Sequence, residues 1–155
     1  MTSLRPARAT AAVLAVGLLA ACGGGSSVDA PSAGGQVTIT NCGQEATFPS
    51  PAERMYVGGD GNLLAMVLAL GAEDQVAGVS GLSDTRQALS TAYGADVVDA
   101  LPVATKDYPT MENVIAQRPD VMLAGWNYGY SEEKKLTPDL LADRDIAGYV
   151  LSESC

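Results

Sequence analysis

Short apolar runs alternate with helix-forming segments from residue 55 onward, and no other feature of the sequence limits the fold as strongly. The predicted strands cover residues 55–59, 75–80, 120–125 and 148–153. The third of these, "DVMLAG", is continuously apolar after its first residue, as in a strand buried on both faces of a parallel sheet. Strands separated by helices pair in parallel through right-handed crossovers. The sequence therefore predicts an α/β fold, an open parallel sheet with helices on both faces.

Helix signals fill the spaces between these strands. Asn62, Thr110 and Thr137 are suited to the N-cap position, and Pro138 follows the last of them at the first helical position. The predicted helices cover residues 62–70, 85–94, 110–118 and 137–145. The stretch 95–109 lacks a clear period, and we expect it to be irregular with at most one short strand.

The first segment of the domain, "VTITNCGQEATFP", reads as a β-hairpin with its turn at "NCGQ". That turn contains Cys42, and the chain has two other cysteines, Cys22 and Cys155. If Cys22 is modified, two cysteines remain, and in an exported protein such a pair is more often bridged than free. We therefore expect a disulfide between Cys42 and Cys155.

The start of the chain has the three regions of a secretory signal. Arg5 and Arg8 precede an apolar run over residues 9–21, which is shorter than the roughly 20 residues that span a bilayer. The following "LAAC" is similar to a bacterial lipobox, so we expect residues 1–21 to be a lipoprotein signal peptide and Cys22 to carry the lipid. The other interpretation is an ordinary signal with Cys22 incidental. Residues 22–35 are rich in Gly and Ser and read as a flexible tether to a domain over 36–155.

Charge and missing motifs exclude several functions. Acidic residues outnumber basic ones 18 to 9, which argues against a nucleic-acid partner. The chain has no histidine, so Ser–His and Cys–His nucleophile pairs and His-based metal sites are excluded. "GGDGN" contains only part of a dinucleotide-binding pattern. We expect no enzyme activity, no catalytic residues, no resident metal and no cofactor.

Ligands of open α/β sheets bind at the carboxyl ends of the strands. The loops expected at that edge contain Asp60 and Asn62 after the first parallel strand, "GLSDTR" (residues 81–86) after the second, and Trp126, Asn127 and Tyr128 after the third. Aromatic rings are rare in this chain, so their clustering after residue 125 is notable. Trp126 either stacks on a ligand or plugs the end of the sheet.

Three segments, "VTITNCGQEATFPSPAERMYVGG", "LLAMVLALGAEDQVAGVS" and "YPTMENVIAQRPDVMLAG", resemble the N-terminal lobe of the iron-siderophore and vitamin B12 class of ABC-importer binding proteins. The resemblance covers residues 36–155, and Glu112 followed by "RPDVMLAG" is its most specific part. It implies one lobe of a two-lobe fold, with Glu112 docking onto a permease. It also implies ligand contacts over residues 106–108, which include Lys106, and over residues 125–128. Without the resemblance, Glu112 reads as an acid that complements a helix dipole.

These observations predict a lipid-anchored, extracytoplasmic substrate-binding protein that captures a ferric siderophore or a similar chelate. Its partners would be an ABC permease with its ATPase, and the membrane through the lipid. The linking helix and second lobe have no counterpart in the sequence, so the chain looks truncated. Only Arg86 lies near a predicted ligand loop, which weakens the case for an anionic siderophore. The alternative is a small envelope lipoprotein that acts as a protein-interaction module.

Overall fold

The computed structural model describes residues 34–59 and 61–155. The predicted signal peptide, the lipid attachment at Cys22, most of the tether, and Asp60 lie outside the described residues. Within the described ranges, no helix has the length and apolar character needed to cross a membrane.

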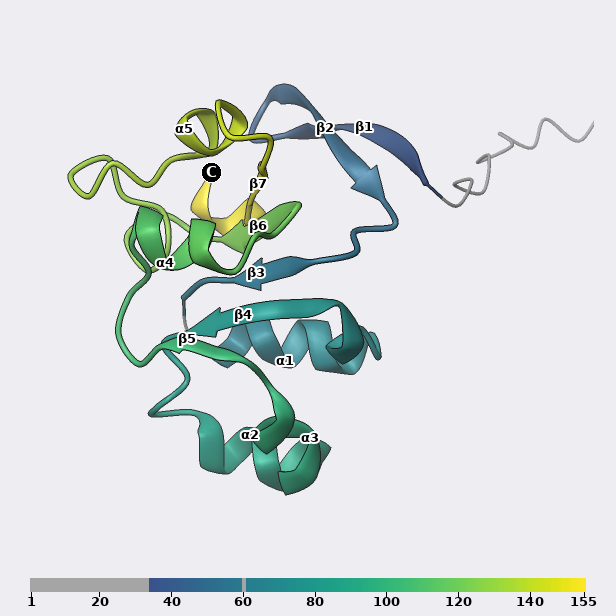
Figure 1. The fold of residues 1–155 in the computed structure, drawn as a ribbon, viewed down its shortest axis with the longest axis vertical. Coiled ribbons are helices and arrows are strands. Elements are labelled where there is room, and N and C mark those ends of the chain that lie inside the picture. Colours follow the sequence, from purple (N-terminus) through teal and green to yellow (C-terminus); the bar gives the residue numbers. More distant parts are fainter. Residues whose placement is uncertain (1–33, 60) are drawn as a thin grey trace, which may run out of the picture.

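A five-stranded parallel sheet forms the centre of the domain, in the order β5-β4-β3-β6-β7. Its strands are β3 (Met55–Val57), β4 (Val76–Ser80), β5 (Val103–Thr105), β6 (Val121–Ala124) and β7 (Ala147–Val150). All four neighbouring pairs are parallel. The predicted open parallel sheet is confirmed (Figure 1).

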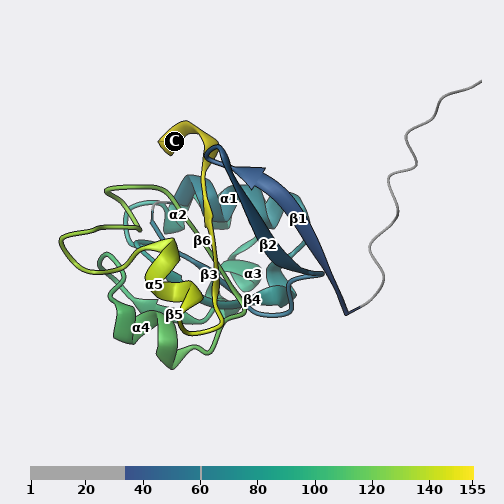
Figure 2. The same ribbon diagram turned by 90° about the horizontal axis from the view of Figure 1, so that it is seen from above.

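Helices cover both faces of this sheet (Figure 2). The α-helices are α1 (Gly61–Ala69), α2 (Arg86–Tyr93), α3 (Ala95–Ala100), α4 (Met111–Ala116) and α5 (Pro138–Ala142). One apolar cluster joins the sheet to α1, α2 and α3, through residues such as Leu64, Leu89 and Val98. A second cluster on the other face contains Val114 of α4 and Leu141 of α5. The sheet is therefore buried on both sides, as its apolar strands require.

Two helices begin as their capping residues predict. The Thr110 side chain accepts a hydrogen bond from the Asn113 N–H, and the Asn113 side-chain oxygen accepts one from the Thr110 N–H, forming a capping box ahead of α4. Thr137 caps α5 by accepting from the Leu140 N–H, with Pro138 at the first helical position.

The predicted N-terminal hairpin is also present. Strands β1 (Gly35–Asn41) and β2 (Gln44–Ser50) pair antiparallel around a two-residue turn. Cys42 and Gly43 of that turn have φ values of 49° and 78°. Positive φ at both central residues is the conformation that matches the twist of a hairpin.

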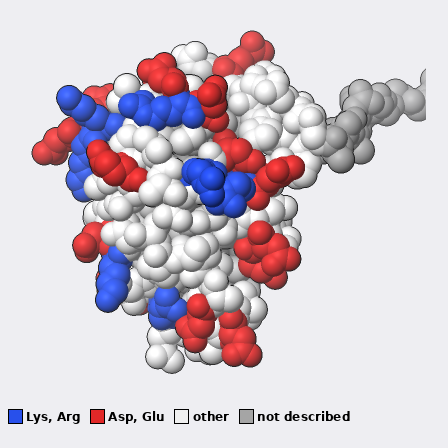
Figure 3. Space-filling view, in the orientation of Figure 1, with Lys and Arg blue, Asp and Glu red and all other residues white. Residues whose placement is uncertain are grey.

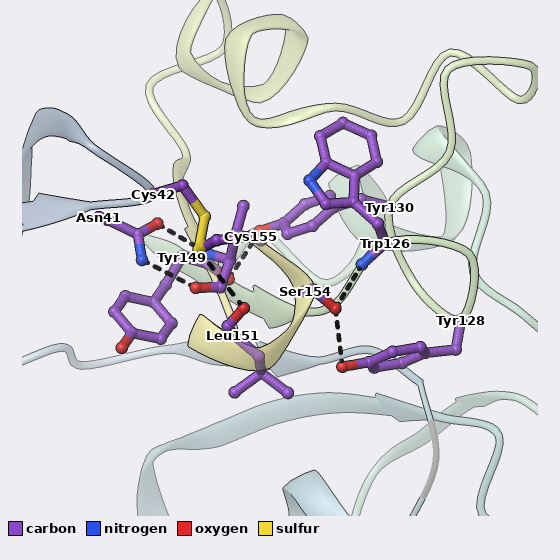
Figure 4. The surroundings of a disulfide bond; sticks show 10 residues. Asn41, Cys42, Trp126, Tyr128, Tyr130, Tyr149, Leu151, Ser154 and Cys155 are labelled. Atoms are coloured by element: carbon purple, nitrogen blue, oxygen red, sulfur yellow. Dashed lines mark hydrogen bonds between the residues drawn. A yellow bond between two sulfur atoms is a disulfide. The ribbon is translucent and has the colours of Figure 1, made fainter.

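The hairpin is attached to the edge strand β7 and to the chain end beyond it by three kinds of contact, of which Figure 4 draws the Asn41 hydrogen bonds and the disulfide. The buried Asn41 amide donates to the Val150 carbonyl at 2.8 Å, and its oxygen accepts from the Val150 N–H at 2.9 Å. Phe48 of β2 packs edge-on against Tyr149 of β7, with ring centroids 5.8 Å apart. Cys42 is bonded to Cys155, as the sequence predicts.

Three local predictions are wrong. Residues 95–109 contain the helix α3 where the sequence predicts irregular chain, and β5 is the one short strand that the prediction allows; α3 is too short for a period to show, and its Val98 is fully buried. Helix α1 begins at Gly61, so Asn62 is its second residue and not its N-cap. Strand β7 ends at Val150, whereas the sequence predicts a strand to residue 153; the chain continues as the 3₁₀ turn η2 (Ser152–Ser154).

One further 3₁₀ turn, η1 (Glu73–Gln75), precedes β4.

Removal of the disulfide tests how much this attachment stabilises the domain. Cys42 and Cys155 are 113 positions apart. Closing a loop of that length stabilises by about 4–5 kcal/mol through the unfolded chain. We expect the double variant Cys42→Ser/Cys155→Ser to lose stability of that order in urea unfolding without reductant. Wild-type protein in dithiothreitol is the matched control and should unfold at the same lower urea concentration. A loss below about 1 kcal/mol would contradict the prediction.

Candidate ligand-binding edge

The carboxyl ends of β3, β4, β5 and β6 meet at one edge of the sheet, where two cavities lie side by side. The first has a volume of about 270 Å³ and the second about 200 Å³. The first is lined by Gly59, Gly81, Ser83, Asp84, Thr85, Lys106, Asp107 and Tyr108. The second is lined by Tyr108, Asn127, Gly129, Tyr130, Ser131, Glu133 and Lys134. The predicted ligand edge is thus hollowed by two cavities, although larger cavities of about 330, 390 and 520 Å³ lie elsewhere on the domain.

Tyr108 lines both cavities and separates them. Its side chain is 52% exposed, and the Lys134 Nζ lies 5.2 Å from its ring centroid. An ammonium at that distance is attracted by the negative face of the ring. This contact joins the loop after β5 to the loop after β6.

Tyr128 occupies the crevice between the ends of β3 and β6. Its ring lies against Gly59, where an added Cβ would come within 2.7 Å of Tyr128 Cδ2. Its hydroxyl donates to Glu153 Oε1 at 2.7 Å and accepts from Ser154 Oγ at 3.2 Å. Ser154 Oγ in turn accepts from the Trp126 N–H at 3.2 Å (Figure 4). The turn η2 therefore holds the loop that follows β6.

Trp126 faces a different region from the two cavities. Its half-buried ring lies 5.7 Å from that of Tyr130, which is fully buried and donates its hydroxyl to the Met122 carbonyl at 2.8 Å. Burial also raises the pKa of Tyr130. Trp126 lines a third cavity of about 390 Å³, beside Asn41 and Pro138. Of the two sequence interpretations, this geometry favours Trp126 as a plug at the end of the sheet.

The structure brings together only some of the residues predicted from the sequence. Lys106 lines the first cavity and Asn127 the second, where Asn127 adopts a positive φ of 69°. Tyr128 lies between the loops that line them. Asn62 is exposed on the first turn of α1 and belongs to neither cavity lining.

Sequence reasoning missed Asp84 and Asp107 as lining residues. The signal for Asp84 was its place in the loop after the second parallel strand, which the sequence assigns to this edge. Asp107 follows β5, a short strand that the sequence allowed but did not place, so only the family resemblance pointed to its loop.

Arg86 does not reach into the site. Its Nη1 lies 2.8 Å from Asp99 Oδ1 and 3.5 Å from the Val98 carbonyl, so the guanidinium is directed at α3. This is the single ion pair among residues 34–59 and 61–155.

Glu112 stands exposed in the first turn of α4, directly after the loop that lines the first cavity. A hydrogen bond from its own backbone N–H and one with the Thr110 side chain lower the pKa of its carboxyl. Glu112 is therefore a solvent-facing negative charge at neutral pH. In the described part of the chain, no three His, Cys, Asp or Glu side chains are grouped so that they could hold a metal ion.

Known structures share this fold, although no family model and no curated protein matches the sequence. An ABC-type Fe3+-hydroxamate transport protein from Saccharomonospora viridis is 26% identical with a TM-score of 0.58, over 77% of this chain and 40% of that one. A periplasmic binding protein from Veillonella parvula is 23% identical with a TM-score of 0.61, over 77% and 37%. The catecholate-siderophore binding protein VctP from Vibrio cholerae is 22% identical with a TM-score of 0.51, over 74% and 37%.

The match covers well under half of each of these three solved structures, and 40% of the first. The chain therefore has the fold of a single lobe, and the resemblance seen in its sequence is confirmed at the level of the fold. The three matched structures are transport or periplasmic binding proteins rather than enzymes.

Proposed function

Because the chain has the fold of one lobe of the periplasmic binding proteins, we propose that it is the substrate-binding component of an ABC importer. It captures a ferric siderophore or a related metal chelate outside the cytoplasmic membrane and hands it to a permease with its ATPase. One observation carries this proposal. The two cavities that meet at Tyr108 lie at the carboxyl ends of the parallel strands, where open α/β sheets bind ligands.

The side chains at this edge suit a large, partly polar chelate. Tyr108 offers an exposed ring that can stack on a flat ligand group. Lys106 and Asn127 supply hydrogen-bond donors from the two cavities. Asp60 follows Gly59 in the sequence and remains a proposed ligand contact. The Tyr128 ring packs against Gly59, which lines the first cavity.

Neither cavity alone is large enough to enclose such a ligand. Small-molecule sites commonly measure roughly 300–1,000 Å³ and bury most of the ligand surface. The cavities here measure about 270 and 200 Å³, and both are open to solvent. This lobe therefore provides one wall of a site, and we propose that a second lobe provides the other.

The one-wall geometry makes a quantitative prediction about affinity. We expect the 155-residue chain to bind ferric siderophores only weakly, and a version that carries a second lobe to bind in the micromolar range or better. Titration followed by tryptophan fluorescence and by calorimetry measures both proteins under the same conditions. Equal affinities would show that the second wall is not needed and would contradict the proposal.

We propose Glu112 as the permease-docking residue of this lobe. It is exposed, ionised, and placed at the same edge as the ligand cavities. A carboxylate in this position can form bidentate hydrogen bonds with an arginine of the permease. Its hydrogen bonds to its own backbone and to Thr110 also stabilise the start of α4, so the test must separate a loss of docking from a loss of folding.

Pull-down from detergent-solubilised membranes of the source organism tests the docking role. We expect the wild-type protein to retain ABC permease subunits, identified by mass spectrometry, and Glu112→Gln to retain several-fold less. Asp139→Asn is the matched control, because Asp139 is also an exposed first-turn carboxylate, on α5. Thermal unfolding of all three proteins checks their folding. If Glu112→Gln retained as much permease as the wild type, Glu112 would have no docking role. If only unrelated envelope proteins were recovered, the alternative function as a protein-interaction module would be favoured.

Cys22 is proposed as the lipid attachment site, and it is tested by localisation. We expect the wild-type chain to fractionate with membranes after expression in a bacterium that processes lipoproteins. Cys22→Ser removes the thiol that would carry the lipid, so this variant should appear in the soluble extracytoplasmic fraction. A Cys22→Ser protein that remains with the membranes would contradict the proposal.

A further inference from the structure

We propose that the two-cavity edge selects uncharged ferric trihydroxamate chelates over ferric tricatecholate anions. This inference rests on the proposed function and adds to it the charge class of the ligand. It is drawn from the charges that line the cavities and from the contacts that engage the arginines elsewhere.

The cavity linings carry no surplus of positive charge. The first cavity contains the carboxylates of Asp84 and Asp107 and one cation, Lys106. The second contains Glu133 and Lys134, which balance each other. The Lys134 ammonium also lies over the Tyr108 ring, which attracts it. The lining of the two cavities together therefore has a formal charge of −1.

Three of the four arginines in the described chain are engaged away from this edge, and the fourth, Arg118, lies at the opposite edge. Arg86 pairs with Asp99 on α3. Arg54 donates from Nε to the Arg118 carbonyl at 2.9 Å and from Nη2 to the Gln117 carbonyl at 2.7 Å. Arg144 donates to the Leu140 carbonyl at 2.6 Å, and Arg118 precedes β6 at the opposite edge of the sheet. No arginine lines either cavity, so the planar fork suited to bidentate anion recognition is missing from both linings.

The surface as a whole has no positive excess either. Acidic side chains are spread over the face shown in Figure 3 and lie beside the basic ones. The whole chain has a formal net charge of −9. An approaching anion is therefore repelled both by the protein as a whole and by the carboxylates within the first cavity.

Ferric chelates of different chemistry differ in net charge, so the negative lining favours some of them over others. Three singly charged hydroxamates neutralise Fe3+, whereas three doubly charged catecholates leave a triply negative complex. A triple negative charge beside a −1 lining is disfavoured by on the order of tenfold in affinity at low salt, after allowance for solvent screening. An uncharged chelate does not meet this penalty, and its carbonyl oxygens can accept hydrogen bonds from Lys106 and Asn127.

Gallium(III) complexes provide the probe, because they have the charges of the ferric complexes and are diamagnetic. The full chain is titrated with gallium-loaded ferrichrome, an uncharged trihydroxamate, and with gallium-loaded enterobactin, a tricatecholate anion. Amide shifts in two-dimensional NMR report weak binding and its location at the same time. We expect both titrations to move the amides of Gly59, Lys106 and Tyr108, with ferrichrome binding roughly tenfold more tightly in 20 mM salt.

Two measurements tie that difference to charge. Raising the salt concentration to 0.5 M should bring the two affinities several-fold closer. Asp84→Asn/Asp107→Asn should strengthen enterobactin binding several-fold and so narrow the affinity ratio between the two complexes. Asp74→Asn is the matched control, because Asp74 is exposed and lines a separate cavity beside Val76 at the start of β4. It should leave the affinity ratio unchanged.

The outcomes separate this inference from the function on which it rests. Equal or tighter binding of gallium enterobactin at this edge would overturn the charge selectivity and leave the proposed function standing. An affinity difference between the two complexes that changes neither with salt nor with Asp84→Asn/Asp107→Asn would also overturn the charge selectivity. If neither complex moves the amides of this edge, the proposed function falls and the inference falls with it.

Discussion

The position of β3 between β4 and β6 determines where the other parts of the molecule lie. Its backbone pairs in parallel with both neighbours, and Gly58 extends the pairing by donating to the Leu123 carbonyl at 2.8 Å. The helix that follows β3 covers one face of the sheet, whereas the helix that follows β6 covers the other. The two outgoing chains must therefore separate at the carboxyl ends of β3 and β6, which creates a crevice there. Tyr128 fills this crevice against Gly59, and the two ligand cavities open beside it.

A continuous set of contacts runs from this crevice to the hairpin. Tyr128 is held by Glu153 and Ser154 of η2, and the next residue, Cys155, is bonded to the hairpin turn at Cys42. The hairpin contributes little to the main apolar clusters, and β1 leaves Val37 and Ile39 about 40% and 39% exposed. Its firm attachments are those to the end of the chain, through Asn41 and the disulfide. The disulfide thus acts on the binding edge indirectly, by fixing the turn that positions the aromatic loop.

The sequence predicts most of this fold because its signals are local. Thr110 and Thr137 are followed by residues that complete a cap, and the apolar strand at 121–124 can be buried only inside a sheet. The sequence could not predict α3 and could not place β5, because they are stabilised by the burial of Val98 and by pairing with β4 rather than by any local period. Site residues were harder still. Trp126 and Lys106 both lie in loops that follow strands, and only the packing of Trp126 against Tyr130 turns its ring away from the cavities. The pairing of Arg86 with Asp99, 13 residues away, likewise depends on tertiary packing that no local sequence signal predicts.

Folding and ligand selection use largely different side chains in this lobe. The apolar clusters on the two faces of the sheet are formed by strand and helix residues that are shielded from solvent. Of the residues that line the two cavities, only Tyr130 belongs to either cluster, and its hydroxyl is engaged with the Met122 carbonyl. The charged lining residues, Asp84, Asp107, Lys106, Glu133 and Lys134, are all exposed. Substitutions of exposed charges usually change stability by about 0.5 kcal/mol or less. The charge of the binding edge can therefore change while the lobe keeps its fold, which is how one scaffold can serve ligands of different charge.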